Sequence, residues 1–545
     1  MVSFVCAALD VVHRTLLNPA ADFVLGPVCR ISKHAVISAL NNISDGCLII
    51  KTPELIYTWD CRAPDAYSQL LIAQLDVVNP AFWLRVATSG DLGFAEAYMY
   101  GEVKCEDLID LFAVLLANRS CMTAIDSYLA RLCRHPLLPL SNSLVRARYN
   151  ASAHYDLGNG VFAAFLSRDM TYSCAIFSEL DGDLEGHNID NIQIVVEDQS
   201  MENDGLEFDQ SMCDGSESDG ADISARQTPV KDTQLSSVED DQELHEAQIR
   251  KIKTIVQKAD IREGHRVLEI GTGWGALAIW IVNNISGTTI DTLTLSEAQA
   301  AVARKRVEAE GLALSCECKD ARVRVHIMDY RNMPAEWAGA FDRMVSVEMV
   351  EAVGIDFLET YWTQIDWALN EQTGVGCIQG ITIPEARFDA YVKDEDFIRK
   401  WSTFFKRLNF PRADRLFLPS SHLRNFEPIV LLASFPSLER GTQGRLVVDS
   451  VENIGPHYAR TLREWRKRFE GRFEDVIVPE LKKEYPDVMG NNAKNAREEI
   501  DVFKRKWIYY FCYCEAGFAS RSLGDHIVTF TREGNVEFGC QALRR

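Results

Sequence analysis

The amino-acid sequence predicts an α/β protein built on a doubly wound, mostly parallel sheet. Strand-like and helix-like segments alternate from residue 247 onward, which is typical of parallel strands covered by helices on both faces. One of these strands leads directly into a glycine-rich turn and a helix. A small α+β domain is expected to precede the sheet, and a strongly acidic segment is expected to interrupt the chain as a disordered insertion.

Four regions follow from these patterns. They are an N-terminal α+β domain at 1–145, the start of the sheet domain at 146–178, the acidic insertion at 179–246 and the remainder of the sheet domain at 247–545. In the first region, short apolar runs predict strands, and apolar residues at helical spacing predict one helix. The expected strands are 47–51, 55–59 and 82–87, and the expected helix is 107–117.

The sheet domain is expected to alternate regularly. Its predicted strands are 266–270, 289–295, 323–328, 341–347 and 376–383. Its predicted helices are 246–258, 275–283, 297–310, 357–369 and a basic helix at 460–472. The basic residues of that last helix either face anionic lipid head groups or form an ordinary solvated surface. They are Arg460, Arg463, Arg466, Lys467 and Arg468.

The acidic segment carries most of the charge of the chain. Residues 179–246 contain 12 Asp and 9 Glu against one Arg and one Lys, so they hold −19 of the formal net charge of −22. Such a segment buries too little apolar surface to offset the entropy of ordering, and it is expected to be disordered. The rest of the chain is nearly neutral, which does not strongly repel an anionic membrane surface.

Composition excludes several classes of protein. The acidic balance argues against nucleic acid as a partner, because phosphates require clustered Lys and Arg. No stretch of 18 apolar residues is free of charge and no secretory signal is evident, so neither a signal peptide nor a transmembrane helix is expected. The 15 Cys include no CxxC pair, and no metal site is expected. The sequence therefore predicts a reduced cytoplasmic protein, with peripheral contact to a membrane left open.

The glycine turn is the most informative local feature. Residues 267–275 (VLEIGTGWG) combine a buried strand with three alternate glycines before a helix. Glycine permits the positive φ of such a turn and lets a ligand approach the backbone. The spacing differs from GxGxxG and from a P-loop, and a P-loop Lys is missing, which tells against a dinucleotide or a nucleoside triphosphate. Glu269 lies within the apolar strand, where a carboxylate is costly unless it is paired.

The turn resembles the first motif of class I S-adenosylmethionine (SAM) methyltransferases. Together with other segments in order, it resembles the cyclopropane-fatty-acyl-phospholipid synthase family, which includes the mycolic acid cyclopropane synthases. The matching segments are 154–160 (HYDLGNG), 170–175 (MTYSCA), 294–299 (TLSEAQ), 329–331 (DYR), 341–354 (FDRMVSVEMVEAVG), 455–465 (GPHYARTLREW) and 514–518 (CEAGF). The resemblance covers about 149–178 and 247–532, and extends weakly to 90–102.

The resemblance implies a class I methyltransferase fold and a site for SAM. The residues expected to hold SAM are Tyr172, Ser173, Glu269, Gly271, Thr272, Gly273, Trp274, Gly275, Thr294, Leu295 and Gln299, with Tyr330 and Arg331 flanking the adenine. The resemblance also implies a bicarbonate ion as the base. Its pocket would be formed by Cys174, Glu351, Gln379, Ile381 (through its backbone) and Tyr458.

Each of these assignments has a structural alternative. Cys174 could be an inert buried thiol, Glu351 a solvated helix residue, and Tyr458 a core residue. Cys514 has been considered catalytic in this family, but a structural role is favoured here because the reaction needs no nucleophile.

Two departures from the family pattern bear on the product. Gln379 stands where the family usually has His; it retains a hydrogen-bond donor but cannot gain a proton near neutral pH. Residues 409–420 (NFPRADRLFLPS) replace a shorter segment with two glycines near the mouth of the site. Either change could favour a branched product.

The sequence therefore predicts a SAM-dependent C-methyltransferase that forms a cyclopropane on an unsaturated acyl chain, carried by a phospholipid. One alternative is C-methylation of another unsaturated lipid, such as a sphingoid base or a polyketide chain. A second is a SAM-binding or lipid-binding module without catalysis. A nucleic-acid methyltransferase is disfavoured because [ND]PP[YF] is missing. The oligomeric state is open, with a homodimer as one option.

Overall fold

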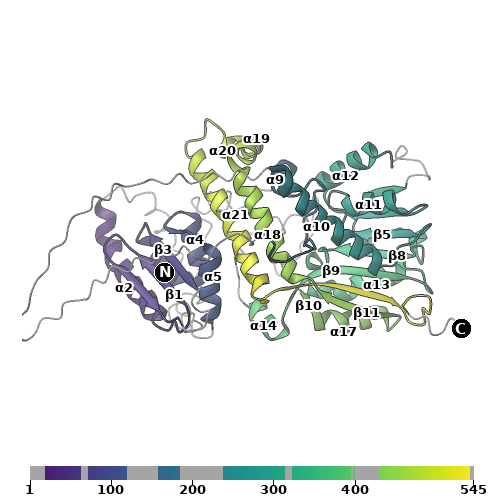
Figure 1. Cartoon of the computed structure of the whole chain (residues 1–545), viewed down its shortest axis with the longest axis horizontal. Coiled ribbons are helices and arrows are strands. Elements are labelled where there is room, and N and C mark those ends of the chain that lie inside the picture. The colour runs from purple at the N-terminus through teal and green to yellow at the C-terminus, as the bar shows by residue number, and fades with distance from the viewer. Residues whose placement is uncertain are drawn as a thin grey trace, which may run out of the picture.

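The structure is a computed structural model that describes residues 19–62, 71–119, 158–183, 237–312, 322–393, 397–398 and 429–539. Within these ranges a four-stranded sheet near the N-terminus and an eight-stranded sheet form two bodies, and two long helices lie between them (Figure 1). The expected break at 137–139, the segment 154–157 and the loop 409–420 lie outside the described residues.

The N-terminal body has the expected α+β character. Its sheet has the order β2-β1-β3-β4, in which β1 is parallel to β3 and the other pairs are antiparallel. The strands are β1 (Cys47–Lys51), β2 (Ile56–Asp60), β3 (Ile72–Val77) and β4 (Val103–Cys105), and the helices are α2 (Pro19–Leu40), α4 (Ala81–Met99) and α5 (Leu108–Ala117). Asp107 caps α5 by accepting hydrogen bonds from the backbone of Ile109 and Asp110.

The predicted strand at 82–87 is wrong, because these residues form the first turns of α4. Phe82, Trp83 and Leu84 are all buried, and Arg85 donates to Glu102 over 2.9 Å in the same core. A continuous apolar run shows that a segment is buried, but its periodicity does not separate a short strand from a buried helix.

The larger sheet has the order β11-β12-β9-β8-β5-β6-β7, with β10 paired to β9. Strands β9, β8, β5, β6 and β7 are parallel, and β12 runs antiparallel between β9 and β11. The strands are β5 (Arg266–Ile270), β6 (Thr289–Thr294), β7 (Val323–Ile327), β8 (Arg343–Val347), β9 (Val375–Ile383), β10 (Ile429–Val430), β11 (Leu446–Asn453) and β12 (Gly524–Arg532). The order reverses between β5 and β8, and such a switch point forms a ligand crevice at the carboxyl ends of the strands.

Helices cover both faces of this sheet. Val267 packs in the core with α10 (Ser237–Lys258), α11 (Ala276–Asn284) and α12 (Glu297–Ala309). Leu268 points the other way, into the core with α13 (Leu358–Ala368) and α17 (Leu431–Thr442). A short helix, α14 (Glu385–Lys393), follows β9. The predicted alternation from 266 to 383 is confirmed, with each element within two residues of its expected ends.

The predicted boundaries of the disordered insertion are wrong at both ends. Residues 179–183 are part of the described structure, and although 179–181 are exposed, the Asp183 side chain is only 5% exposed. At the other end α10 begins at Ser237, ten residues before the predicted boundary. Both ends carry acidic side chains that pair with buried arginines, so charge that suggested disorder contributes to packing instead. Residues 184–236 of the predicted insertion lie outside the described residues.

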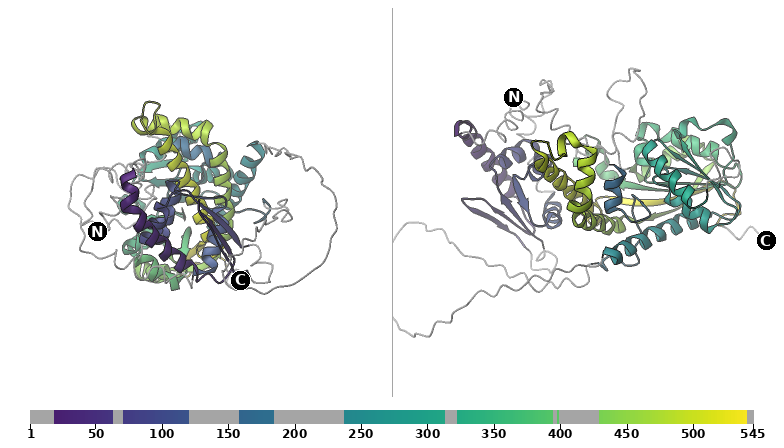
Figure 2. Two further views of the ribbon diagram at one scale, coloured as in Figure 1. Left: turned by 90° about the vertical axis from the view of Figure 1, so that its left-hand side faces the viewer. Right: turned by 90° about the horizontal axis from the view of Figure 1, so that it is seen from above.

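Helices α18 (Gly455–Gly471) and α21 (Ala496–Ala519) join the two bodies (Figures 1 and 2). One face of α21 packs in the core of the larger body through Phe503, Trp507, Phe511 and Phe518. Its other face packs in the N-terminal core through Val502, Tyr509, Cys512 and Ala516. The short helices α9 (Asn159–Phe165), α19 (Val478–Glu484) and α20 (Pro486–Met489) lie close to this pair (Figure 1). Among the described residues, no helix is long and apolar enough to cross a bilayer.

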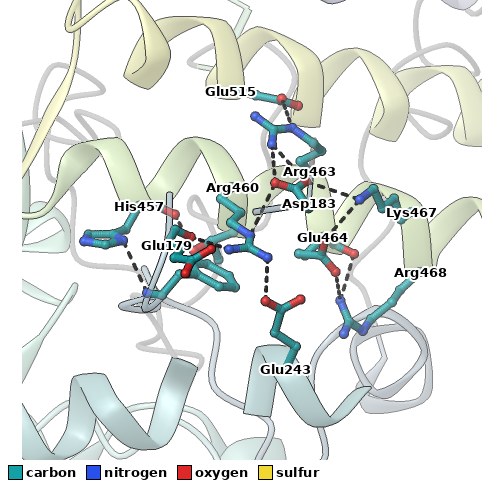
Figure 3. A network of polar contacts seen from close by, with 12 residues as sticks. Glu179, Asp183, Glu243, His457, Arg460, Arg463, Glu464, Lys467, Arg468 and Glu515 are labelled. Atoms are coloured by element: carbon teal, nitrogen blue, oxygen red, sulfur yellow. Dashed lines mark hydrogen bonds and ion pairs between the residues drawn. The ribbon is translucent and has the colours of Figure 1, made fainter. Parts of the chain in front are cut away.

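The arginines of the basic face of α18 are buried or half-buried, so both predicted environments are wrong for them, whereas the Lys467 side chain is 49% exposed. Arg460 is 2% exposed and bonds to Glu243 over 2.5 Å, while Arg463 contacts Asp183 and Glu515 over 2.9 and 2.8 Å (Figure 3). The remaining pairs are Arg466 with Glu515, Lys467 with Asp183 and Glu464, and Arg468 with Glu464. Acidic residues from the two ends of the predicted insertion and from α21 neutralise these cations, which the helix sequence alone does not reveal.

Candidate functional site

The glycine turn forms a backbone cradle at the carboxyl end of β5. Gly271, Gly273 and Gly275 have φ values of +108°, +50° and +86°, a region that side chains disfavour. The backbone N–H groups of Gly271 and Thr272 both donate to Leu293 over 3.0 Å, which fixes the turn against β6. A Cβ atom at Gly273 would meet nothing within 4 Å, so the backbone faces open space. This open cradle fits a ligand such as SAM.

Two side chains of the turn serve the core instead. Trp274 is buried against Phe162, and its ring N–H donates to Asn159 over 2.9 Å. Thr272 accepts a hydrogen bond from Thr292 over 2.7 Å. Only the backbone of these two residues is therefore available to a ligand in the turn.

Glu269 lies below the turn within the core. Burial raises the pKa of its carboxyl group to about 8, although a hydrogen bond from Thr292 opposes this. Within the described part of the chain its Oε2 atom has no hydrogen-bond partner. The sequence analysis required a partner for this buried carboxylate, and only one of its two oxygens has one.

The other residues predicted to hold SAM lie at the ends of β6 and β7. Thr294 donates to Gln299 over 3.0 Å, and Leu295 follows it directly at the start of α12. Arg331 forms a two-pronged pair with Asp329, and the Tyr330 ring packs edge-on against Tyr361. Because β6 runs parallel to β5 and β7 runs parallel to β6, the carboxyl ends of these strands lie at the edge of the sheet that carries the glycine turn. Their roles in binding SAM remain predictions.

A carboxylate missed by the sequence analysis lies at the centre of the predicted catalytic pocket. Glu348 directly follows β8, and its Oε1 atom accepts from the Cys174 backbone N–H over 2.7 Å and from Gln379 Nε2 over 3.0 Å. Its Oε2 atom accepts from the Tyr458 hydroxyl over 2.6 Å. Three residues predicted to surround a bicarbonate ion thus surround a side-chain carboxylate.

Two further carboxyl groups complete the cluster. Asp525 on β12 accepts from Gln379 Nε2 over 2.7 Å, and Glu351 accepts from the Ile381 backbone N–H over 2.6 Å. Asp525 Oδ1 and Glu351 Oε2 have no hydrogen-bond partner among the described residues. We call Glu348, Glu351 and Asp525 the acid cluster.

The acid cluster is electrostatically strained. Burial and then the charge of Asp525 raise the pKa of Glu348 to about 8. Burial and then the charge of Glu348 raise the pKa of Glu351 to about 8. The charge of Lys251 opposes that of these carboxylates, and its ammonium group donates a hydrogen bond to Ser173 Oγ over 2.6 Å. Through Lys251, the Ser173 side chain is linked to this cluster.

Aromatic side chains wall the acid cluster on the side of the interdomain helices. Tyr458 stacks on Phe518 with ring centres 4.4 Å apart, and Tyr172 stacks on Trp465 at 4.9 Å. The Tyr172 hydroxyl bonds to that of Tyr510 over 3.0 Å. Such a wall excludes water from the carboxylates.

The two predicted cysteines occupy different places. Cys174 is buried in the acid cluster, where burial raises the pKa of its thiol well above the ordinary value, so it is not a nucleophile. Cys514 lies instead near the hydroxyl groups of Tyr172 and Tyr510, whose pKa values it helps to raise.

The turn and the acid cluster adjoin each other. A Cβ atom on Gly271 would lie 3.1 Å from the Cβ of Met349, the residue after Glu348. The donors predicted for bicarbonate are bonded to carboxylates of the chain, Cys174, Gln379 and Tyr458 to Glu348 and Ile381 to Glu351, so the residues present do not fit that ion. The sequence offered one signal for Glu348, its position at the carboxyl end of a predicted parallel strand. Asp525, Lys251 and Tyr510 carried no signal, because only the tertiary fold brings them here.

Comparison with known proteins supports the family that the sequence motifs predict. Residues 142–206 and 236–526 match the family described as mycolic acid cyclopropane synthetase. The chain is 30% identical over 459 residues to tuberculostearic acid methyltransferase UfaA1 of Mycobacterium tuberculosis, covering 83% of this chain and 81% of that protein. It is 25% identical over 485 residues to cyclopropane-fatty-acyl-phospholipid synthase of Escherichia coli, covering 89% and 94%.

Two further matches are more distant. A sphingolipid C9-methyltransferase of Komagataella phaffii is 26% identical over 248 residues, which cover 45% of each chain. The solved structure of the cyclopropane synthase MmaA2 from Mycobacterium tuberculosis is 18% identical, covers 73% of this chain and 100% of that chain, and has a TM-score of 0.44.

The strand order and the glycine turn after β5 define a class I SAM-dependent methyltransferase. The chain belongs to the mycolic acid cyclopropane synthetase family.

Proposed function

We propose that this chain is a SAM-dependent C-methyltransferase that acts on the carbon–carbon double bond of an unsaturated acyl chain, carried by a phospholipid, and forms a cyclopropane. The observation that carries the proposal is the position of the glycine turn against Met349, the residue that directly follows Glu348 of the acid cluster. An electrophilic methyl donor held in the turn would lie next to buried carboxylates that can stabilise a developing positive charge. The relatives act on lipids by name, which supports an acyl chain as the acceptor.

The residues of the site have separate roles in this reaction. When bound, SAM supplies a methyl group that is transferred as a cation to the π electrons of the alkene. The turn and the ends of β6 and β7 would hold the donor in place. The acid cluster stabilises the positive charge on the acyl chain and accepts a proton. The stacked pair of Tyr458 and Phe518 keeps water from capturing the cation.

A methyl-branched or methylene-branched product is the second candidate. Two relatives are named for methylation rather than cyclopropanation, and Gln379 departs from the family pattern inside the acid cluster. A cyclopropane forms when a proton leaves the new methyl group and the electron pair of that C–H bond closes the ring. Loss of a proton from a chain carbon next to the cation gives a methyl-branched alkene, and a hydride shift from the methylated carbon to the cation followed by loss of a methyl proton gives a methylene branch. Both products add one CH₂, so mass alone does not separate them.

The experiment is incubation with methyl-labelled SAM and vesicles of unsaturated phospholipid, followed by lipid mass spectrometry. The expected product is an acyl chain heavier by one labelled CH₂. Mild catalytic hydrogenation then separates the candidates, because a branched alkene takes up hydrogen and a cyclopropane does not. Saturable SAM binding without labelled product from any unsaturated lipid would support the binding module instead.

Peripheral contact with a membrane and a homodimer both remain predictions. The membrane prediction loses most of its support from the basic face of α18, because the four arginines of that face are buried or half-buried and Lys467 alone of the five cations is exposed.

A further inference from the structure

We propose that Glu348 is the proton acceptor of this enzyme and that its carboxylate occupies the place predicted for a bicarbonate ion. The base would then be part of the chain rather than a bound anion. This inference rests on the proposed function, and it concerns a residue that the sequence analysis did not single out.

The hydrogen bonds support this role directly. Cys174, Gln379 and Tyr458 each donate a hydrogen bond to a carboxylate oxygen of Glu348. Three donors converging on two oxygens stabilise the ionised carboxylate, which is the form of Glu348 that accepts a proton. A bicarbonate ion would have to compete for the same donors.

The charge around the position also disfavours a free anion. Glu351 and Asp525 are buried beside Glu348, and each raises the pKa of a neighbouring member of the cluster. A further small anion would add a like charge at short range in a region that excludes water. A carboxylate carried by the chain is held there by covalent structure and does not have to bind.

The backbone of Glu348 provides an independent observation. Its φ is +47°, in the left-handed region that is unfavourable for a residue with a side chain. The conformation is held by a backbone hydrogen bond from Glu348 to Gln379 over 2.9 Å. Such strain concentrates at functional sites, where the fold maintains a conformation because of where it directs the side chain.

Gln379 fits a carboxylate that belongs to the chain. Its Nε2 atom carries two hydrogens and donates one to Glu348 and the other to Asp525. A histidine nitrogen carries a single hydrogen and could not bridge both carboxylates. We therefore assign Gln379 as a positioning residue, which accounts for its departure from the family pattern.

The proposed reaction consists of methyl transfer followed by removal of a proton. The π electrons of the alkene form the bond to the transferred methyl carbon, whose former bond pair stays on sulfur, and the other alkene carbon becomes positive. Glu348 removes a proton from the new methyl group. The electron pair of that C–H bond forms the second new carbon–carbon bond and closes the ring. The proton remains on the acid cluster, whose raised pKa values allow it to be held near neutral pH.

Two variants separate the side-chain base from a bound one. In Glu348→Gln, the amide side chain has nearly the size of the carboxylate but accepts no proton, so it still fills the position of the anion. Glu348→Gly removes the side chain, relieves the left-handed backbone and opens the three donors to a small anion. Circular dichroism and SAM binding establish that each variant is folded, and Glu348→Asp provides a third, carboxylate-bearing variant should Glu348→Gly fail to fold.

The first readout is binding of ¹³C-labelled bicarbonate by NMR, which does not depend on turnover. We expect saturable binding to Glu348→Gly and none to the unmodified protein or Glu348→Gln. Saturable binding to the unmodified protein would overturn the inference.

The second readout is methyl transfer to unsaturated phospholipid in CO₂-free buffer. The unmodified protein should be active without bicarbonate, and Glu348→Gln should lose about 10²–10⁴-fold, the usual contribution of a general base. Glu348→Asp should retain more activity than Glu348→Gln, and bicarbonate should raise the rate of Glu348→Gly only. Full activity of Glu348→Gln, or stimulation of the unmodified protein by bicarbonate, would overturn the inference. If the unmodified protein labels no lipid, the proposed function fails, and the NMR experiment still decides whether Glu348 fills the anion position.

Discussion

The hydroxyl group of Tyr458 donates a 2.6 Å hydrogen bond to the carboxylate of Glu348. This bond links α18, one of the two helices between the bodies, to the carboxyl end of β8. It places an aromatic wall and a candidate base in direct contact, so changes to Tyr458 should report on Glu348.

Replacement of Tyr458 by Phe should slow methyl transfer by about 10- to 100-fold at neutral pH. A hydrogen bond to a charged group contributes roughly 1.5–3 kcal/mol, and its loss disfavours the ionised form of Glu348. The Phe ring preserves the stacking on Phe518. The pH–rate profile of Tyr458→Phe should also move to higher pH, a change that a purely structural defect would not cause.

The rate of the unmodified protein should rise with pH and level off above about pH 8. Burial and the charge of Asp525 raise the pKa of Glu348 to about 8, so below that pH the carboxyl group is largely protonated and cannot accept a proton. Single-turnover rates between about pH 6 and pH 9 test this. A rate that stays constant over this range would contradict a base in the acid cluster.

The free energy of unfolding should fall over the same range of pH. Glu348 and Glu351 have pKa values near 8 in the folded protein and near 4 when unfolded, so between these values only the folded state binds the protons. Raising the pH removes that advantage. Urea unfolding at about pH 6 and pH 9 should differ by at least about 1.4 kcal/mol, the equivalent of one pKa unit.

Glu351→Gln should reduce this pH dependence, because it removes one of the repelling charges. An unchanged pH dependence in this variant would contradict the assignment of the effect to the acid cluster.

Replacement of Arg463 by Met should destabilise the protein by about 3–5 kcal/mol. The change leaves Asp183 and Glu515 buried without a major partner. Arg440→Met is the matched control, because Arg440 and Glu359 form a pair with side chains 60% and 54% exposed. Such a surface pair contributes about 0–1 kcal/mol. Equal losses on urea unfolding would show that the α18 pairs are not buried.

Replacement of Gly271 by Val should abolish SAM binding. The new side chain would lie against Met349 at a φ of +108°, which distorts the cradle. Gly264→Ala is the control, since Gly264 has a φ of +80° but its added Cβ meets nothing within 4 Å. Calorimetric titration should show SAM binding by the control and none by Gly271→Val.

The sequence predicted the parallel core well and the acid cluster only in part. Strands 266–270 and 289–295 were predictable because buried runs and amphipathic helices alternate there with clear turns. Glu348 had one signal, its place at the end of a predicted strand, but Asp525 and Lys251 had none, because Asp525 reaches the cluster through the order of the sheet and Lys251 through the packing of α10. The basic face of α18 was misread for the same reason, since its acidic partners lie far away in the chain.

The position of the transferred carbon tests the central claim most directly. After reaction of the unmodified protein with SAM carrying a ¹³C-methyl group and an unsaturated phospholipid, NMR of the extracted lipid shows which carbons bond to the label. We predict a labelled carbon bonded to both former alkene carbons. Label confined to the head group, or no label in the lipid while SAM remains bound, would contradict methyl transfer to the double bond.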